Sequence, residues 1–380
     1  MYRFHFKVML LLLLSAALVF PAHAAHEKSA QERIETLSSR IENLEKQLAE
    51  KPAGLDWIEN VVISGLLEAE AGYEKHEPAA AGESDEESSD IVLATMELGI
   101  DTDFNDYISG HVLFLWEEDE TEPVDVDEGF MTLSGGNACP GYVRAGKFYV
   151  PFGNFESIFI SDPLTLELGE TNESAVLAGY AAGPFDVSAG VFNGDIAEAG
   201  KDDHIDDYFG SATYSFNENA FGGIAASAGV SYISNIGDSD GLSDALSEDI
   251  PEDETTEIAD KVAGMSAYLH ATLAERVFFV AEYVGALDDF AAGELEPAAP
   301  SLQPRTWNTE LAYVFESECG FGVKYEGADD VADALAETRY GAVAFCHPFP
   351  GTFLGLECLR ETYEKEDDNT VVTAQLAYEF

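Results

Sequence analysis

The sequence is poor in basic residues. It contains 18 Lys and Arg against 73 Asp and Glu, which gives a formal net charge of −55. A surface of that charge repels nucleic acid and anionic lipid, so the composition excludes both as partners. The excess of acid fits a protein that attracts cations. It equally fits a surface kept soluble by charge in surroundings where salt screens the repulsion.

Long apolar runs are missing after the first 24 residues. No later stretch reaches the roughly 18 apolar residues that a membrane-spanning helix needs. Residues 1–24 combine Arg3 and Lys7, a short apolar run, and Ala22-His23-Ala24 at the end. This pattern predicts a secretory signal peptide that is cleaved after Ala24. A membrane anchor helix is the alternative, but the run of about a dozen residues is too short to cross a bilayer.

Catalytic and metal-binding motifs are also missing. The sequence has no G-x-S-x-G elbow, no phosphate-binding loop and no H-E-x-x-H pair. Asp238-Ser239-Asp240-Gly241 resembles the start of a calcium loop, but the later bidentate Glu is missing, and a solvated acidic loop is the favoured interpretation. We therefore predict no enzymatic activity, no cofactor and no metal ligand, with His111 and His270 as ordinary wall residues and His204 in a loop.

Cysteine is scarce. The four residues are Cys139, Cys319, Cys346 and Cys358, and they lack the C-x-x-C spacing of a zinc site. An exported protein meets oxidising conditions that permit disulfides. Counting back from a predicted turn near residue 332 places Cys319 opposite Cys346 on neighbouring strands. The sequence therefore predicts a Cys319–Cys346 bridge.

Glycine, aromatic residues and a period of two dominate from residue 57 onward. The chain has 33 Gly, 24 Phe and 16 Tyr. In residues 61–73 apolar side chains alternate with polar ones such as Glu68 and Glu70, as in a transmembrane strand with one lipid face and one lumen face. We predict an all-β fold, a 16-stranded antiparallel transmembrane β-barrel. The sixteen predicted strands are 57–73, 90–101, 106–117, 124–134, 141–150, 174–182, 184–193, 206–217, 222–234, 261–272, 275–287, 304–316, 319–327, 337–347, 351–363 and 370–380.

The connections between these segments alternate between long and short. Residues 74–89, 151–173 and 288–303 are long, whereas 102–105 and 318–320 are tight turns. Long loops at one end and short turns at the other are typical of outer-membrane barrels of Gram-negative bacteria. The last segment ends on Phe380 with apolar residues at alternate positions upstream, which resembles the signal read by the barrel assembly machinery.

Residues 26–52 predict a short coiled-coil helix ahead of the barrel. Ile34, Leu37, Ile41, Leu44 and Leu48 repeat at spacings of three and four. Self-association into a dimer or trimer is favoured over a single amphipathic helix at the periplasmic end. The predicted organisation is a signal peptide at 1–24, a periplasmic coiled coil and linker at 25–54, and an outer-membrane barrel at 55–380.

The long segment 151–173 is too apolar for a solvated loop. A turn at Pro151-Phe152-Gly153 precedes it, and a barrel of sixteen strands would otherwise enclose a wide channel. We expect this segment to fold into the bore and narrow it, with packing over the rim as the alternative. The residues assigned to this constriction loop are Pro151, Phe152, Gly153, Asp162, Pro163, Glu167 and Glu170.

The predicted lumen face is acidic. Rings of acid in a pore favour cations, while no residue pattern specifies a catalytic carboxylate pair. Arg276 is also assigned to this face, where it offsets part of the acid. The side chains predicted to line the pore are Glu68, Glu70, Glu97, His111, Glu117, Glu282, Glu310, Lys324, Glu326 and Arg339.

Three stretches resemble the LbtU family of siderophore porins. They are GKFYVPFGNFES (Gly146–Ser157), SDPLTLELGET (Ser161–Thr171) and VDEGFMTL (Val126–Leu133). The resemblance implies a sixteen-stranded outer-membrane barrel with a periplasmic coiled coil that takes up iron-loaded siderophore without a plug domain. Two alternatives stay open: a general cation-preferring porin for small hydrophilic solutes, and an exported acidic β protein that binds calcium in a structural or adhesive role.

Overall fold

The computed structural model describes most of the chain from residue 60 onward. Within residues 60–380 it leaves out 81–83, 119–120, 122, 137–138, 203, 217–221, 248–249, 251–255, 297–298, 332–334 and 364–366. The predicted signal peptide and coiled coil lie outside the described residues. In the described part, no helix is long and apolar enough to cross a membrane.

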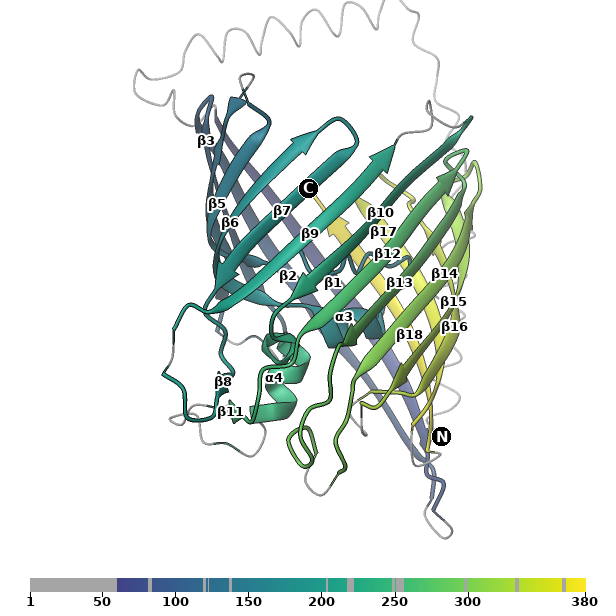
Figure 1. Ribbon diagram of the computed structural model, residues 1–380. Helices are drawn as coiled ribbons and strands as arrows, with labels where there is room; N and C mark the ends of the chain where they lie inside the picture. The colour runs from purple at the N-terminus through teal and green to yellow at the C-terminus, as the bar shows by residue number, and fades with distance from the viewer. Residues whose placement is uncertain are drawn as a thin grey trace, which may run out of the picture. The chain divides into compact units, whose positions relative to one another are not determined.

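The predicted barrel is confirmed. Sixteen antiparallel strands form a closed ring, in which β1 pairs with β18 (Figure 1). Each predicted segment coincides with one strand, with ends displaced by a few residues. The barrel strands are β1 (Val61–Glu77), β2 (Glu86–Asn105), β3 (Ile108–Trp116), β4 (Asp125–Ser134), β5 (Gly141–Tyr149), β6 (Asn172–Ala182), β7 (Phe185–Phe192), β9 (Asp207–Phe216), β10 (Ile224–Ile233), β12 (Gly264–Leu273), β13 (Val277–Ala286), β14 (Arg305–Val314), β15 (Cys319–Asp329), β16 (Thr338–Cys346), β17 (Thr352–Thr362) and β18 (Asp368–Glu379).

Alternation along each strand separates an apolar outer face from a polar inner face. On β14, Leu311 is 50% exposed on the outside, while the adjacent Glu310 is 0% exposed and faces inward. On β15, Tyr325 is 53% exposed and the adjacent Glu326 is 0% exposed. The side-chain period of two in a strand therefore sorts this sequence onto the two faces of the barrel wall.

Exposed aromatic side chains form two bands around the outer face. Between the bands the exposed side chains are largely aliphatic, such as Val187 and Val230. Aromatic girdles at two heights are characteristic of a barrel that sits in a lipid bilayer. The band near the short turns contains Tyr107, Tyr180, Phe185, Tyr214, Phe315, Phe321, Tyr378 and Phe380, and the band near the long connections contains Tyr208, Tyr232, Tyr283, Tyr325 and Tyr340.

Long connections gather at one end of the barrel and short turns at the other (Figure 1). One short turn joins β12 to β13 through Ala274 and Glu275, both with positive φ (51° and 56°), as a tight hairpin between right-twisted strands requires. The long connections carry two helices, α3 (Leu164–Gly169) and α4 (Asp240–Ser247), the 3-10 turn η3 (Ile236–Asp238), and the parallel pair β8 (Ala197–Glu198) and β11 (Glu257–Ile258).

The connection after β10 corrects one expectation. We expected Asp238 to Gly241 to lie in a solvated acidic loop. Asp240 and Gly241 are exposed, but Asp238 is 2% exposed and Ser239 is 0% exposed. The Asp238 carboxylate accepts hydrogen bonds from the backbone N–H of Ile196 (2.9 Å) and from Asn235 Nδ2 (2.9 Å). These donors replace water, so the acid is buried in the fold rather than displayed.

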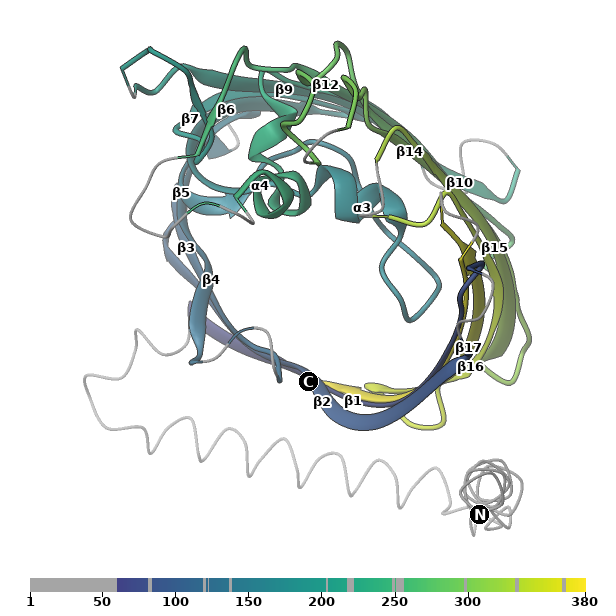
Figure 2. The same ribbon diagram turned by 90° about the horizontal axis from the view of Figure 1, so that it is seen from below.

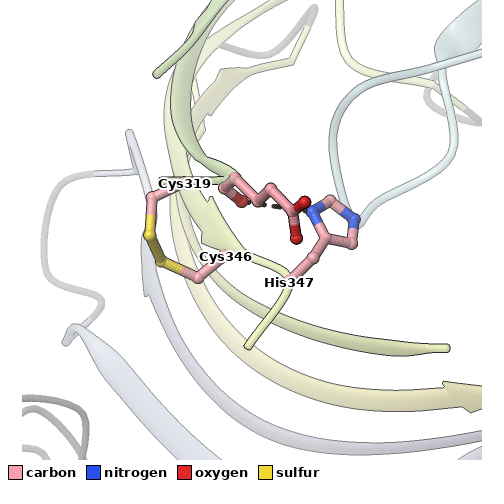
Figure 3. The surroundings of a disulfide bond; sticks show 4 residues. Cys319, Cys346 and His347 are labelled. Carbon is pink, nitrogen blue, oxygen red and sulfur yellow. Dashed lines mark hydrogen bonds between the residues drawn. A yellow bond between two sulfur atoms is a disulfide. The ribbon is translucent and has the colours of Figure 1, made fainter. Parts of the chain in front are cut away.

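A disulfide joins Cys319 at the start of β15 to Cys346 at the end of β16 (Figure 3). The two residues are direct partners in the strand register, with a Cα–Cα distance of 3.9 Å. The next residue, His347, donates its backbone N–H to the carbonyl oxygen of Glu318 (3.1 Å). The bridge therefore fixes the register of this hairpin at the short-turn end.

Candidate functional site

The segment between β5 and β6, residues 150–171, runs inside the barrel. Figure 2, a view along the bore, shows α3 and its flanking chain within the ring of strands. The inward bend follows Pro151 and Phe152 at Gly153, whose φ of 87° suits glycine, and a Cβ there would lie 2.3 Å from the Phe155 ring. The expectation that 151–173 folds inward is thus what the structure shows.

Glutamates on two neighbouring strands hold the first half of the segment by its backbone. Glu282 on β13 accepts the N–H groups of Asn154 (2.8 Å) and Phe155 (3.0 Å). Glu310 on β14 accepts the N–H of Ile158 (2.7 Å). Hydrogen bonds to an ionised acceptor are about twice as strong as neutral ones, so each carboxylate is an effective anchor.

Two further glutamates hold the second half. Glu357 on β17 accepts the N–H of Ile160 (2.8 Å) and hydrogen bonds from both the N–H and the hydroxyl of Ser161. Glu326 on β15 accepts the N–H of Leu164, the first residue of α3 (3.0 Å). The start of a helix leaves such N–H groups without partners, and the Glu326 carboxylate satisfies one of them.

Two cations lie under the same segment. Lys324 Nζ is 3.1 Å from a Glu326 carboxylate oxygen and 4.7 Å from the centre of the Phe159 ring. Arg339 donates from Nε to Glu361 (2.7 Å) and from Nη1 to the carbonyl oxygen of Asp162 (2.9 Å). Burying an ion is tolerable when it is paired in this way, so the positive charge of both residues is largely neutralised beneath the segment.

The residues that hold the segment include five of the predicted pore-lining side chains, one of which is Arg339. Glu282, Glu310, Lys324 and Glu326 face inward, but the segment covers them, and their exposed fractions are 4%, 0%, 4% and 0%. They bind the segment to the wall instead of bordering open water. Alternation along a strand predicts that these side chains face inward. It does not predict that residues 150–171, which are distant in sequence, cover them.

The underside of the segment is apolar and buried. Phe152 is 1% exposed, Leu164 0% and Leu168 1%. Phe152 and Leu168 belong to a cluster that also includes Leu242 of α4 and Phe290 of the connection after β13. Full burial of one such side chain contributes about 2 kcal/mol, so the connections at this end stabilise one another.

On the side of the segment that faces the open bore, carboxylate side chains are exposed. Asp162 and Glu167 are exposed, and Pro163 between Asp162 and α3 is buried. Asp162 interacts electrostatically with Glu117 at the end of β3 and with Glu68 on the wall. Acid therefore lines both sides of the passage between the segment and this part of the wall.

Protein surroundings shift the ionisation of these segment carboxyls. Burial raises the pKa of Glu170 to about 8, and the neighbouring Asp240 and Asp162 carboxylates add to the rise. The Asp162 side chain is exposed to the bore, but the surrounding protein desolvates its carboxyl and raises its pKa above the ordinary range, although the nearby Lys324 opposes the shift. A low-dielectric wall disfavours the charged form of an acid, and so do like charges.

The opposite wall carries the remaining predicted lining residues. Glu68, Glu70 and Glu97 are half-buried, and Gln375 Nε2 donates to Glu70 (2.8 Å). His111 lies between two carboxylates, with Nδ1 2.7 Å from Asp101 and Nε2 3.4 Å from Glu128.

A second histidine faces the infolded segment. His270 Nδ1 lies 2.9 Å from a Glu156 carboxylate oxygen. Both histidines thus contact acids, and among the residues that the structure describes, no group of three or more His, Cys, Asp or Glu side chains is arranged to hold a metal ion.

Two inner-face expectations change in the structure. Arg276, which we expected on the lumen face, lies in the short turn before β13 and pairs with Glu316 (3.0 Å). Conversely, Arg144 on β5 faces inward but was not among the predicted inner-face residues. Its position four residues before Phe148 places both side chains on the same face of the strand. Its guanidinium lies over the Phe130 ring, with Cζ 4.4 Å from the ring centre.

A closed sixteen-stranded barrel with an infolded connection after β5 has the architecture of porins. The outer-membrane channel DcaP of Acinetobacter baumannii superposes with a TM-score of 0.57 at 13% identity, covering 84% of this chain and 97% of that one. The anion-selective porin of Comamonas acidovorans gives 0.57 at 13%, with coverage of 84% and 99%. Pseudomonas putida OprB gives 0.56 at 12%, with coverage of 85% and 95%. At these identities the likeness establishes the fold.

Sequence relatives carry no functional name. The UPF0422 protein of Coxiella burnetii is 26% identical over 263 residues, which is 68% of this chain and 54% of the relative. A UPF0422 protein of Legionella pneumophila strain Lens is 25% identical over 302 residues, with coverage of 71% and 54%. The chain spans about half the length of these curated relatives. No protein-family model matches the sequence, so the resemblance to the LbtU family stays a prediction.

Proposed function

We propose that this protein is a non-enzymatic channel in the outer membrane of a Gram-negative bacterium, through which small hydrophilic solutes pass with a preference for cations. The aromatic bands and the aliphatic outer face support a lipid environment. The cation preference is proposed because Asp162 and Glu167 are exposed on the infolded segment, where Asp162 interacts with the Glu117 carboxylate on the wall.

The charge balance at the narrowed passage is one-sided. The two lumen cations nearest the segment, Lys324 and Arg339, are paired with Glu326 and Glu361 beneath it. Asp162 on the open side interacts electrostatically with both cations, but each of them is already paired with a carboxylate, and Glu117 on the wall adds a further acid. Rings of carboxylates concentrate cations and repel anions, so this arrangement favours cation flux.

Charge removal at Asp162 tests the proposal. Asp162→Asn should lower the potassium-to-chloride permeability ratio in planar bilayers about twofold at low salt, with less effect in 1 M salt, where the Debye length falls to about 3 Å. Asp106→Asn, in the exposed turn between β2 and β3, is the matched control and should leave the ratio unchanged. An unchanged ratio in Asp162→Asn would remove this residue from the selectivity mechanism.

An iron-loaded siderophore or another iron chelate is the second candidate cargo. Its support is that Gly146–Ser157, which carries the resemblance to siderophore porins, contains the inward bend and the backbone N–H groups of Asn154 and Phe155 that bind Glu282. A channel for such a cargo should show current block by the ferric chelate at micromolar concentration, whereas a general porin should not. Retention in the outer membrane after salt and chelator washes would also exclude an adhesive calcium-binding protein.

The assembly proposals concern the two ends of the chain. We place the predicted coiled coil at 25–54 in the periplasm, where it would associate the barrels into trimers or dimers. Phe380, which pairs with Gly65 through both backbone hydrogen bonds (3.1 Å each), would be read by the barrel assembly machinery during insertion.

A further inference from the structure

Arg144 is a cation on the inner face of β5 for which the described residues provide no carboxylate partner. Lys324 and Arg339, the cations under the infolded segment, each form ion pairs with nearby glutamates. Arg144 instead stacks on two aromatic rings, with Cζ 4.4 Å from the Phe130 centre and 5.4 Å from the Phe148 centre. Arg144 thus differs from Lys324 and Arg339, the other inward-facing cations described above.

The aromatic pair fixes the guanidinium in place. Phe130 and Phe148 meet edge to face at 5.9 Å, and His111 stacks on Phe130 at 5.0 Å. Gly146 makes room for this arrangement, because a Cβ there would lie 2.8 Å from Phe130 Cβ. Stacking of Arg on aromatic rings leaves its in-plane N–H donors available for a planar acceptor.

Arg144 lies on the short-turn side of the point where the segment leaves β5 and bends inward. Arg144 precedes Val150, where the segment turns inward, by six positions, which corresponds to about 20 Å along the strand at 3.3 Å per residue. Arg144 is half-buried, and its Nε is buried without a hydrogen-bond partner. Because Nε is buried, a solute that has passed the acidic segment would meet the terminal nitrogens of a fixed guanidinium.

We propose that Arg144 binds the carboxylate of a solute whose net charge is zero or positive, such as a basic amino acid, on its way through the bore. The acidic passage admits the cationic group and rejects net anions, and Arg144 then donates two hydrogen bonds to the carboxylate. The proposal rests on the channel function proposed above and adds the chemical class of the solute to it.

Lysine and cadaverine provide a matched pair of probes, because they differ by one carboxylate. In single-channel recordings on the full-length protein, lysine should give brief current blocks that last about ten times longer than those of cadaverine. Arg144→Gln should shorten the lysine blocks to the cadaverine value and leave cadaverine unchanged. Arg144→Lys should retain part of the effect, because the charge stays while the planar donor pair is lost.

The control variant is Arg276→Gln, which removes the same charge from an exposed turn and should leave both probes unchanged. Correct folding of each variant is verified by its shift in gel mobility on heating. Equal block times for the two probes in the native protein, or lysine blocks that persist in Arg144→Gln, would overturn the proposal while leaving the channel intact. If the native protein passes no current, the channel function fails, and isothermal titration of lysine into detergent-solubilised native and Arg144→Gln protein decides the binding question.

Discussion

At the scale of residues, the carboxylates on the inner wall have two different uses. Those on β13, β14, β15 and β17 are buried and accept backbone N–H groups, while those on β1 and β2 stay half-exposed to the bore. Both sets consist of glutamates, and both occupy inward-facing positions of their strands. What separates them is whether the segment between β5 and β6 covers them.

Removal of one anchor should loosen the segment. Glu310→Ala deletes the acceptor for the Ile158 N–H and the Ser157 hydroxyl, each at 2.7 Å. Loss of these hydrogen bonds should cost about 3 kcal/mol and leave Lys324 with one carboxylate fewer nearby. We expect larger single-channel conductance and faster protease cleavage within the segment.

The control for this change is Glu316→Ala, because Glu316 lies exposed in the turn after β14. It should match the native protein in both measurements. A Glu310→Ala protein with native conductance and native cleavage rate would show that the remaining three glutamates suffice to seat the segment.

At the scale of elements, the sequence predicts the strands well and the contacts inside the barrel less well. The period of two and the turn residues locate all sixteen strands, because both signals are local. The same signals place Cys319 opposite Cys346. They do not reveal that Glu282 holds Asn154 across a separation of 128 residues, since that contact depends on the closed ring. They also miss that Asp238 is buried, because one of its hydrogen-bond donors, the Ile196 N–H, comes from another connection.

The Cys319–Cys346 bridge should stabilise the β15–β16 hairpin. It closes a loop with a sequence separation of 27 residues, for which loop-closure entropy gives about 3.5 kcal/mol. The double variant Cys319→Ser, Cys346→Ser should unfold at a lower guanidinium concentration than the native protein, and reductant should remove the difference. Cys358→Ser, which alters an exposed thiol, is the control. Detection of Cys319 and Cys346 as unpaired thiols by mass spectrometry would contradict the prediction.

At the scale of the whole molecule, the acidic bore makes function depend on pH. Glu170, with a pKa raised to about 8, and Asp240, with a pKa raised to about 6, are neutral below these values and negative above them. Cation preference should therefore rise between pH 5 and pH 9. The Glu170→Gln variant should lack the part of this rise that lies between pH 7 and pH 9, whereas Glu275→Gln, in an exposed turn, should keep it.

Stability should change in the opposite direction over part of this range. Because the folded-state pKa of Glu170 lies above its ordinary value of 4.5, ionisation opposes folding, and the contribution of this group to stability falls as the pH rises from about 4.5 to about 8. Thermal unfolding of the native protein and of Glu170→Gln across this range measures the effect. Parallel pH curves for the two proteins would show that Glu170 ionises normally.

The way the infolded segment is attached has a consequence for how such channels diverge. The glutamates accept hydrogen bonds from the backbone N–H groups of Ile158, Ile160 and Leu164. These positions therefore require only a backbone N–H, which every amino acid except proline supplies. Side chains along the segment can therefore be exchanged while its seat in the barrel is retained. A lineage that inherits this wall can change what passes through it by altering a few exposed positions such as Asp162 and Glu167, without rebuilding the cylinder around them.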